Sequence, residues 1–201
     1  FEDAQAARAD EVAVFGSASE GFSRANVNAG VDEALERFAT VIAAARAIDL
    51  PVRGYVSCVV ECPYDGAVAP AAVARVADRL FAMGCYEISL GDTLGRASPE
   101  GIARMLMAVR DVVPVGRLAG HYHDTGGQAL SNIDASLSLG VRAFDASGGV
   151  QRVVLVGPVQ RDRGDAARIG FNIYRHDECP PRRPRAKSAA SFTTCRSSPV
   201  A

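Results

Sequence analysis

Two histidines lie two residues apart in the segment HYHDTGGQ, residues 121–128, and the chain has only three histidines in all. The run 117–123 is predicted to be a strand, in which residues two apart point to the same face, so His121 and His123 should project together. Two imidazoles on one strand end can bind a divalent ion, with a carboxylate from another strand completing the set. The alternative is a pair of hydrogen-bonded polar residues, because His-x-His is a short and common pattern.

A carboxylate stands in the segment SLGDTLG, residues 89–95, directly after an apolar run. Asp92 could orient a histidine, hold a substrate hydroxyl or serve as a base. The structural alternative is a turn or helix cap, for which an aspartate followed by threonine is well suited. From the residues alone the cap is somewhat favoured.

Two cysteines, Cys58 and Cys62, are separated by three residues, and no second nearby pair accompanies them. A structural zinc site is therefore not expected, and buried or partly buried free thiols are the better interpretation. Tyrosines 55, 86 and 122 fall within predicted strands and are expected to pack.

The elements that must position these side chains alternate along the chain. Strands are predicted at 11–16, 52–58, 85–90, 117–123 and 141–146, and helices at 31–49, 70–83, 98–113 and 126–139. This alternation favours a parallel sheet with helices outside it. The segment FGSASEG after the first strand lacks the G-x-G-x-x-G spacing that is typical of a doubly wound sheet. A (β/α)8 barrel needs about 250 residues, so the sequence predicts an incomplete barrel of about five βα units.

Active sites of such barrels lie at the C-terminal ends of the strands. The polar residues expected at those ends are Ser17, Ser19, Glu20, Ser57, Cys58, Ser89, Asp92, Thr93, His121, His123, Asp124, Asp145 and Ser147.

Composition divides the 201-residue chain into two parts. Residues 1–150 carry 12 arginines against 19 acidic residues, a balance of −7, whereas residues 151–201 carry ten basic and four acidic residues, a balance of +6. The predicted domains are therefore a partial barrel over 1–149 and a basic tail over 150–201, rich in proline and arginine, that is expected to be disordered. The sequence contains no uninterrupted run of eighteen or more apolar residues, so a membrane-spanning helix is not expected. The chain has five cysteines and no recognisable export signal, which indicates reduced thiols and not disulfides.

The motifs EVAVFGSASEGFSRANVN, PVRGYVSCVVECPYDG, MGCYEISLGDTLG and HYHDTGGQALSNI, in this order, closely resemble the hydroxymethylglutaryl-CoA lyase family over residues 1–147. The resemblance implies a barrel enzyme that uses Mg²⁺ or Mn²⁺ to split 3-hydroxy-3-methylglutaryl-CoA into acetyl-CoA and acetoacetate, a step of leucine degradation. It implies that His121 and His123 are metal ligands, with His121 also counted as catalytic, and that Asp92 is an active-site acid. It further implies that Ser89 and Thr93 lie at the substrate.

This sequence also departs from the family pattern. The family begins with a strand that ends in an Arg-Asp pair, whose aspartate binds the metal, and it continues after the last strand through a G-L-G-G-C-P loop and an asparagine ligand. Here residues 146–165 read ASGGVQRVVLVGPVQRDRGD, and no cysteine follows until Cys179. Of four expected protein ligands, two remain. A frameshift near Gly149 is one interpretation of the change, and an authentic basic extension that contacts RNA or acidic partners is the other.

Three functions are therefore weighed: a lyase of this family, a non-catalytic truncated remnant of it, and a related acyl-CoA aldol-type lyase or synthase. The resemblance implies an acyl-CoA substrate and a homodimer in the complete protein, with no nucleic acid or membrane as partner. The single lysine against 21 arginines suggests a GC-rich genome. The expected compartment is then a bacterial cytoplasm, or the mitochondrial matrix in a eukaryote. Because the sequence starts at Phe1 and not at a methionine, it is expected to be a piece of a longer chain.

Overall fold

Five parallel strands form the centre of the computed structural model, which describes residues 1–145. The predicted tail, residues 150–201, lies outside the described residues. The strands stand side by side in the order in which they occur along the chain, which is β1-β2-β5-β6-β7. Their bounds are Val12–Ser17, Val52–Ser57, Glu87–Asp92, Leu118–Tyr122 and Ala143–Asp145.

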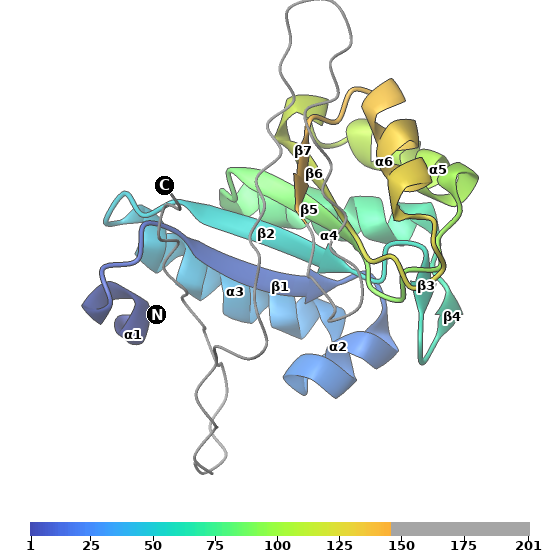
Figure 1. Cartoon of the computed structure of the whole chain (residues 1–201). Coiled ribbons are helices and arrows are strands. Elements are labelled where there is room, and N and C mark those ends of the chain that lie inside the picture. Colours follow the sequence, from blue (N-terminus) through green and yellow to red (C-terminus); the bar gives the residue numbers. More distant parts are fainter. Residues whose placement is uncertain (146–201) are drawn as a thin grey trace, which may run out of the picture.

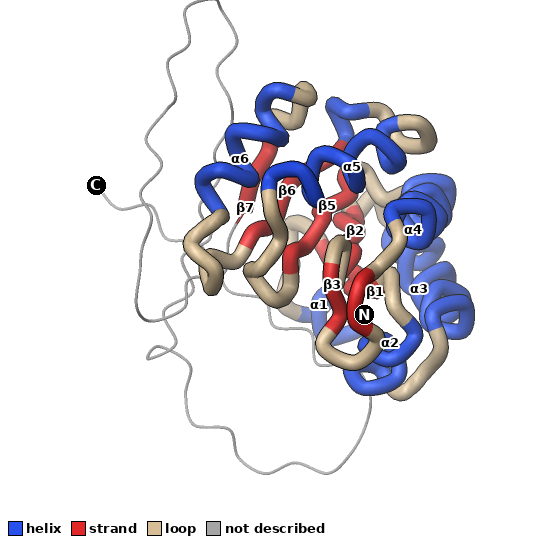
Figure 2. Tube along the Cα trace, turned by 90° about the vertical axis from the view of Figure 1, so that its right-hand side faces the viewer, coloured by secondary structure: helices blue, strands red, loops and turns tan. Residues whose placement is uncertain are grey.

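This strand order confirms the prediction of an incomplete (β/α)8 barrel. A doubly wound sheet reverses its strand order at a switch point, whereas each strand here pairs with the one before it. Figures 1 and 2 show the strands following one another along a curved sheet, with the larger helices gathered on one side of it. The opposite, concave side corresponds to the interior of a barrel.

The covering helices are α3 (Val31–Arg46), α4 (Pro70–Met83), α5 (Pro99–Arg110) and α6 (Ala129–Ser138). Proline opens both α4 and α5, at a position where a missing N–H costs nothing, and the Ser98 side chain caps α5 by accepting from the Gly101 amide. Gly84 ends α4 in the left-handed conformation, with φ of 112°. These starts and stops agree with the sequence patterns.

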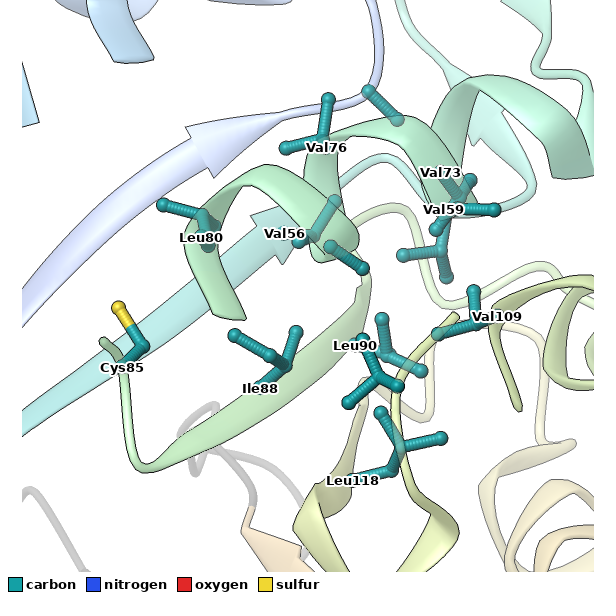
Figure 3. Close-up of a cluster of buried hydrophobic side chains, with 14 of the residues drawn as sticks. Val56, Val59, Val73, Val76, Leu80, Cys85, Ile88, Leu90, Val109 and Leu118 are labelled. Atoms are coloured by element: carbon teal, nitrogen blue, oxygen red, sulfur yellow. The ribbon is translucent and has the colours of Figure 1, made fainter. Parts of the chain in front are cut away.

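Side chains of the sheet alternate strictly between its two faces. Even-numbered strand residues such as Val56, Ile88, Leu90 and Leu118 pack against the helices, and Figure 3 shows them beside Leu80 of α4. All five are almost fully buried, and burial of a side chain of this size contributes about 1.5–3 kcal/mol. Odd-numbered strand residues therefore face the concave side.

Several elements differ from the predictions. The sequence patterns missed two short helices, α1 (Glu2–Ala6) and α2 (Glu20–Val27), a hairpin of β3 (Glu61–Cys62) and β4 (Gly66–Ala67), and a 3₁₀ turn, η1 (Val115–Arg117). The predicted strand 85–90 lies two residues further on, because the Cys85 amide still bonds to the Leu80 carbonyl at the end of α4. Among the described residues, none of the helices has the length and apolar character needed to cross a membrane.

Candidate functional site

The histidine pair lies where β6 ends, at the C-terminal edge of the sheet. His121 is the last residue but one of β6 (Leu118–Tyr122), and His123 is the first residue after the strand. The two Nε2 atoms lie 3.2 Å apart, and the ring centroids are 5.1 Å apart. The prediction that the two imidazoles project together is thus confirmed.

A carboxylate from the neighbouring strand holds the first ring. Asp145 on β7 is the register partner of His121, and its Oδ1 atom bonds to the His121 Nδ1 atom. The other oxygen, Oδ2, accepts from Arg53, from the Tyr55 hydroxyl at 3.2 Å and from the Ser89 hydroxyl at 3.4 Å. One carboxylate on the concave face therefore joins residues from four strands.

Neighbouring groups stabilise the negative charge of the Asp145 carboxylate. Burial by itself would raise the pKa of this carboxyl group, but the hydrogen bond from His121 and the positive charge of Arg53 outweigh burial and hold the pKa below its ordinary value. Asp145 is consequently an ionised carboxylate near neutral pH, and an ionised carboxylate can only accept hydrogen bonds.

Arg53 is the cation of this network and is itself buried, with 9% of its surface exposed. Its guanidinium group bonds to Glu87 on β5 at 2.7 and 2.8 Å and to the Tyr55 hydroxyl at 2.6 Å, besides Asp145. Burial alone would lower the pKa of Arg53, but these neighbours raise it above its ordinary value. A single arginine thus partners two buried carboxylates.

The second histidine is held in its neutral form. Burial and the adjacent His121 ring lower the pKa of His123 below its ordinary value, and the charge of Asp92 opposes the shift only in part. A neutral imidazole offers a nitrogen lone pair, which is the form that binds metal ions.

Asp92 organises a loop. It ends β5 as the register partner of Tyr122, so it lies on the even-numbered side of the sheet, and 1% of it is exposed. Its two carboxylate oxygens accept from the backbone amides of Gly95, at 3.1 Å, and Ala97, at 3.0 Å. These contacts are those of the turn cap that the sequence offered as the alternative; the role of active-site acid stays a prediction.

The two residues predicted to lie at the substrate, Ser89 and Thr93, also form hydrogen bonds within the protein. Ser89 is fully buried and donates to Asp145, as described above. The Thr93 hydroxyl oxygen accepts from the Cys58 amide at 2.8 Å and ties the end of β5 to the end of β2. Their contact with a substrate stays a prediction.

The loops after β5 and β6 are packed closely against each other. The Gly126 amide donates to the Gly95 carbonyl at 2.7 Å. Gly95 has a φ of 65°, and a Cβ atom there would lie 2.8 Å from the Thr125 backbone nitrogen and 2.9 Å from the His123 carbonyl carbon. Only glycine allows this approach, which places the loop that Asp92 caps directly beside His123.

The thiols do not join the histidines. Cys58 and Cys62 are free and buried, as expected. Burial raises the pKa of Cys58 to about 11, so its thiol stays protonated near neutral pH and is a poor metal ligand.

The histidine pair has the geometry that a divalent ion needs from two of its ligands. Ligands about 2.1 Å from a magnesium-sized ion, in an octahedron, lie roughly 3 Å from their neighbours, close to the observed 3.2 Å between the Nε2 atoms. A metal-binding histidine also commonly donates its other ring N–H to a carboxylate, as His121 does to Asp145. Within residues 1–145 no group of three or more His, Cys, Asp or Glu side chains is arranged to hold a metal, so the pair accounts for part of a coordination sphere.

Sequence reasoning missed two of the residues gathered here, Arg53 and Glu87, and placed Asp145 at a strand end without assigning it a role. Tyr55 packs as expected, with its ring stacked 4.7 Å from that of Phe15, but its hydroxyl also belongs to the network. The signal that was present is the alternation within each strand: the buried apolar residues Val52, Val56 and Ile88 face the helices, so their neighbours Arg53, Tyr55 and Glu87 take the opposite face.

Comparison with known proteins places this site in context. A family model described as HMGL-like matches residues 1–148. Hydroxymethylglutaryl-CoA lyase of Pseudomonas mevalonii is 55% identical over 147 residues, which cover 73% of this chain and 49% of that protein. The mitochondrial hydroxymethylglutaryl-CoA lyase of Gallus gallus is 54% identical with the same coverage. The chain spans about half the length of the curated relatives it matches.

Solved structures agree with this likeness. The HMG-CoA lyase of Brucella melitensis superposes with a TM-score of 0.71 at 59% identity, covering 73% of this chain and 51% of that one. An HMG-CoA lyase of Acinetobacter baumannii, solved in complex with coenzyme A and 3-methylmalate, gives a TM-score of 0.67 at 27% identity and covers 73% and 48% of the two chains.

Proposed function

The chain belongs to the HMGL-like family, and from that membership we propose that it carries the cation-binding strand of an enzyme that cleaves 3-hydroxy-3-methylglutaryl-CoA into acetyl-CoA and acetoacetate. The observation that carries the proposal is the pair of Nε2 atoms 3.2 Å apart at the C-terminal edge of a barrel sheet. High identity to lyases over the described residues supports the same reaction.

His121 and His123 would hold the divalent cation, Mg²⁺ or Mn²⁺. When bound, such an ion lowers the pKa of the hydroxyl group that it contacts and orients the substrate for carbon–carbon cleavage. The protein's own part is to present the two imidazoles in fixed positions, the first held by Asp145 and the second carried on backbone that packs against the loop after β5. Gly91, the register partner of His121, adds no side chain beside that ring on the concave face.

The remaining assignments are part of the same proposal. Asp92 is proposed as the active-site acid, and Ser89 and Thr93 as residues near the substrate, since Asp92 ends β5, Thr93 follows it and Ser89 lies on its concave face. An acyl-CoA substrate is supported by the relative solved with coenzyme A. We further propose a homodimer for the complete protein, and a bacterial cytoplasm as the compartment on the basis of the strong preference for arginine over lysine.

Mn²⁺ binding to the purified 201-residue chain tests the cation site, with electron paramagnetic resonance reporting free Mn²⁺. We expect His123→Ala to weaken binding at least about tenfold, because it removes one of two ligands. The control is Asp32→Asn, which changes an exposed carboxylate on α3 and should leave the affinity unchanged. Equal affinities for wild type and His123→Ala would overturn the assignment.

Lyase activity is measured separately, as acetoacetate released from 3-hydroxy-3-methylglutaryl-CoA with Mg²⁺ or Mn²⁺. Turnover that His123→Ala abolishes would support the proposed reaction for this chain. Mn²⁺ binding without turnover would contradict it and favour the non-catalytic remnant.

A further inference from the structure

The Asp145 carboxylate stands between a cation and an imidazole, and its two oxygens serve different partners. Oδ2 faces donors only, namely the Arg53 guanidinium and the hydroxyl groups of Tyr55 and Ser89. Oδ1 faces the Nδ1 atom of His121. Asp145 has 9% of its side chain exposed and Arg53 has 10%, so water competes little for these bonds.

This arrangement dictates where the imidazole carries its proton. A carboxylate oxygen only accepts hydrogen bonds, so the ring nitrogen that faces it must be an N–H group. In the neutral ring the proton then resides on Nδ1, and Nε2 keeps its lone pair. Nε2 is the atom that lies 3.2 Å from the Nε2 atom of His123.

We infer that Asp145, oriented by Arg53, is the positioning residue that fixes His121 in the Nδ1-protonated tautomer and so makes its Nε2 atom available to a divalent cation. Asp145 acts through His121 and does not itself bind the ion. The inference rests on the proposed function for the identity of the ligand, but the tautomer can be measured without any metal.

Arg53 determines which atom of the side chain at position 145 faces it and which atom faces His121. Its guanidinium group is anchored on the far side by two bonds to Glu87, and it has only donors to offer. Whatever group stands at position 145 must therefore turn an acceptor toward Arg53. A carboxylate has a second acceptor left for His121, whereas a carboxamide does not.

The substitution Asp145→Asn uses this difference while conserving shape. The amide oxygen is expected to turn toward Arg53, which leaves the NH₂ group facing Nδ1 of His121. An NH₂ group donates, so the ring proton moves to Nε2, the atom proposed to bind the cation. The analogous exchange at a buried aspartate beside a catalytic histidine is known to select the wrong tautomer.

The experiment is ¹⁵N nuclear magnetic resonance of the His121 ring in the metal-free full chain, assigned with a His121→Gln variant, together with Mn²⁺ affinity. We expect an Nδ1–H tautomer in the wild type and an Nε2–H tautomer in Asp145→Asn, whose Mn²⁺ affinity falls about 10–100-fold. Asp32→Asn changes an exposed carboxylate on α3 and should alter neither quantity. Circular dichroism checks that each variant is folded.

The outcomes separate the inference from the proposed function. An Nε2–H tautomer in the wild type, or an unchanged tautomer in Asp145→Asn, overturns the inference even if Mn²⁺ binds. A switched tautomer supports it even if the wild-type chain binds no Mn²⁺, a result that would count against the proposed function instead. If Asp145→Asn does not fold, the wild-type tautomer alone still decides.

Discussion

Single residues of the concave face depend on one another through Asp145 and Arg53. Arg53 partners two carboxylates, those of Asp145 and Glu87, and all three side chains are less than a fifth exposed. Removing one member of a buried ion pair leaves an uncompensated charge, which destabilises more strongly than the pair itself stabilises. The ion pairs of Arg53 therefore affect both the stability of the fold and the position of the His121 ring, which Asp145 holds.

We predict that Arg53→Met lowers the free energy of unfolding by about 3–5 kcal/mol, because Asp145 and Glu87 would remain buried without their cation. The matched control is Arg75→Met. Arg75 pairs with Asp32 at 2.6 Å, but both side chains are about half exposed or more, so its loss should cost less than about 1 kcal/mol. Urea denaturation measures both values, and a similar cost for the two variants would contradict the network's role.

The lowered pKa of Asp145 makes a second prediction, on pH. The folded state binds the Asp145 proton less readily than the unfolded state does, so this group's stabilisation is fully present above the ordinary aspartate pKa of about 3.9. It is lost as the pH falls from there through the lower pKa of the folded state. Unfolding free energies measured from pH 6 to pH 3 should fall less steeply in Asp145→Asn than in the wild type. Parallel curves would show that the carboxyl group is not stabilised as described.

Among the secondary-structure elements, the loops after β5 and β6 have the most direct effect on the site. Asp92 caps the first loop, and Gly95 brings that loop against the backbone of His123 and Thr125. The Asn132 side chain of α6 also holds this loop, by donating to the Ala97 carbonyl at 2.9 Å, but the close approach itself depends on the absence of a side chain at residue 95.

We predict that Gly95→Ala is more destabilising than Gly127→Ala and that it alone weakens Mn²⁺ binding. Both glycines have a left-handed φ, of 65° and 70°, so both variants carry the same backbone strain of about 1–2 kcal/mol. Gly127, however, has no atom within 4 Å of its missing Cβ. The difference between the two variants in thermal stability and Mn²⁺ affinity isolates the close approach; equal effects would mean that strain alone matters.

At the scale of the whole molecule, the described core is contained within the first three quarters of the chain. The buried apolar residues described run from Ala4 to Phe144, and the family model matches residues 1–148, up to the change of composition near Gly149. We therefore propose a domain boundary at residue 149, as the charge balance predicts.

Truncation tests this boundary. A chain of residues 1–149 should give the helical circular dichroism signal expected of residues 1–145 and the same Mn²⁺ affinity as the 201-residue chain. Loss of the helical signal on truncation would show that residues 150–201 belong to the fold. Resequencing the gene near Gly149 is the complementary test, since a clean read in the present frame would exclude the frameshift interpretation.

The sequence by itself determined the order of the strands and helices, the incomplete barrel and the joint projection of His121 and His123. These features depend on contacts between near neighbours: the two-residue period of a strand, the apolar faces of helices, and glycine and proline at their ends. It left element ends uncertain by a few residues, as at Glu87, because the cap of α4 absorbs two residues that the apolar pattern assigned to the strand.

Only the tertiary structure decided which partners the histidines have. Asp145 meets His121 from 24 residues away, and Arg53 meets Asp145 from 92 residues away. Both contacts depend on the register between parallel strands, which the crossing helices and loops set and which no spacing along the chain encodes. The cap contacts of Asp92, which the motif somewhat favoured, are likewise seen only in the structure, where its oxygens accept from the backbone amides of Gly95 and Ala97.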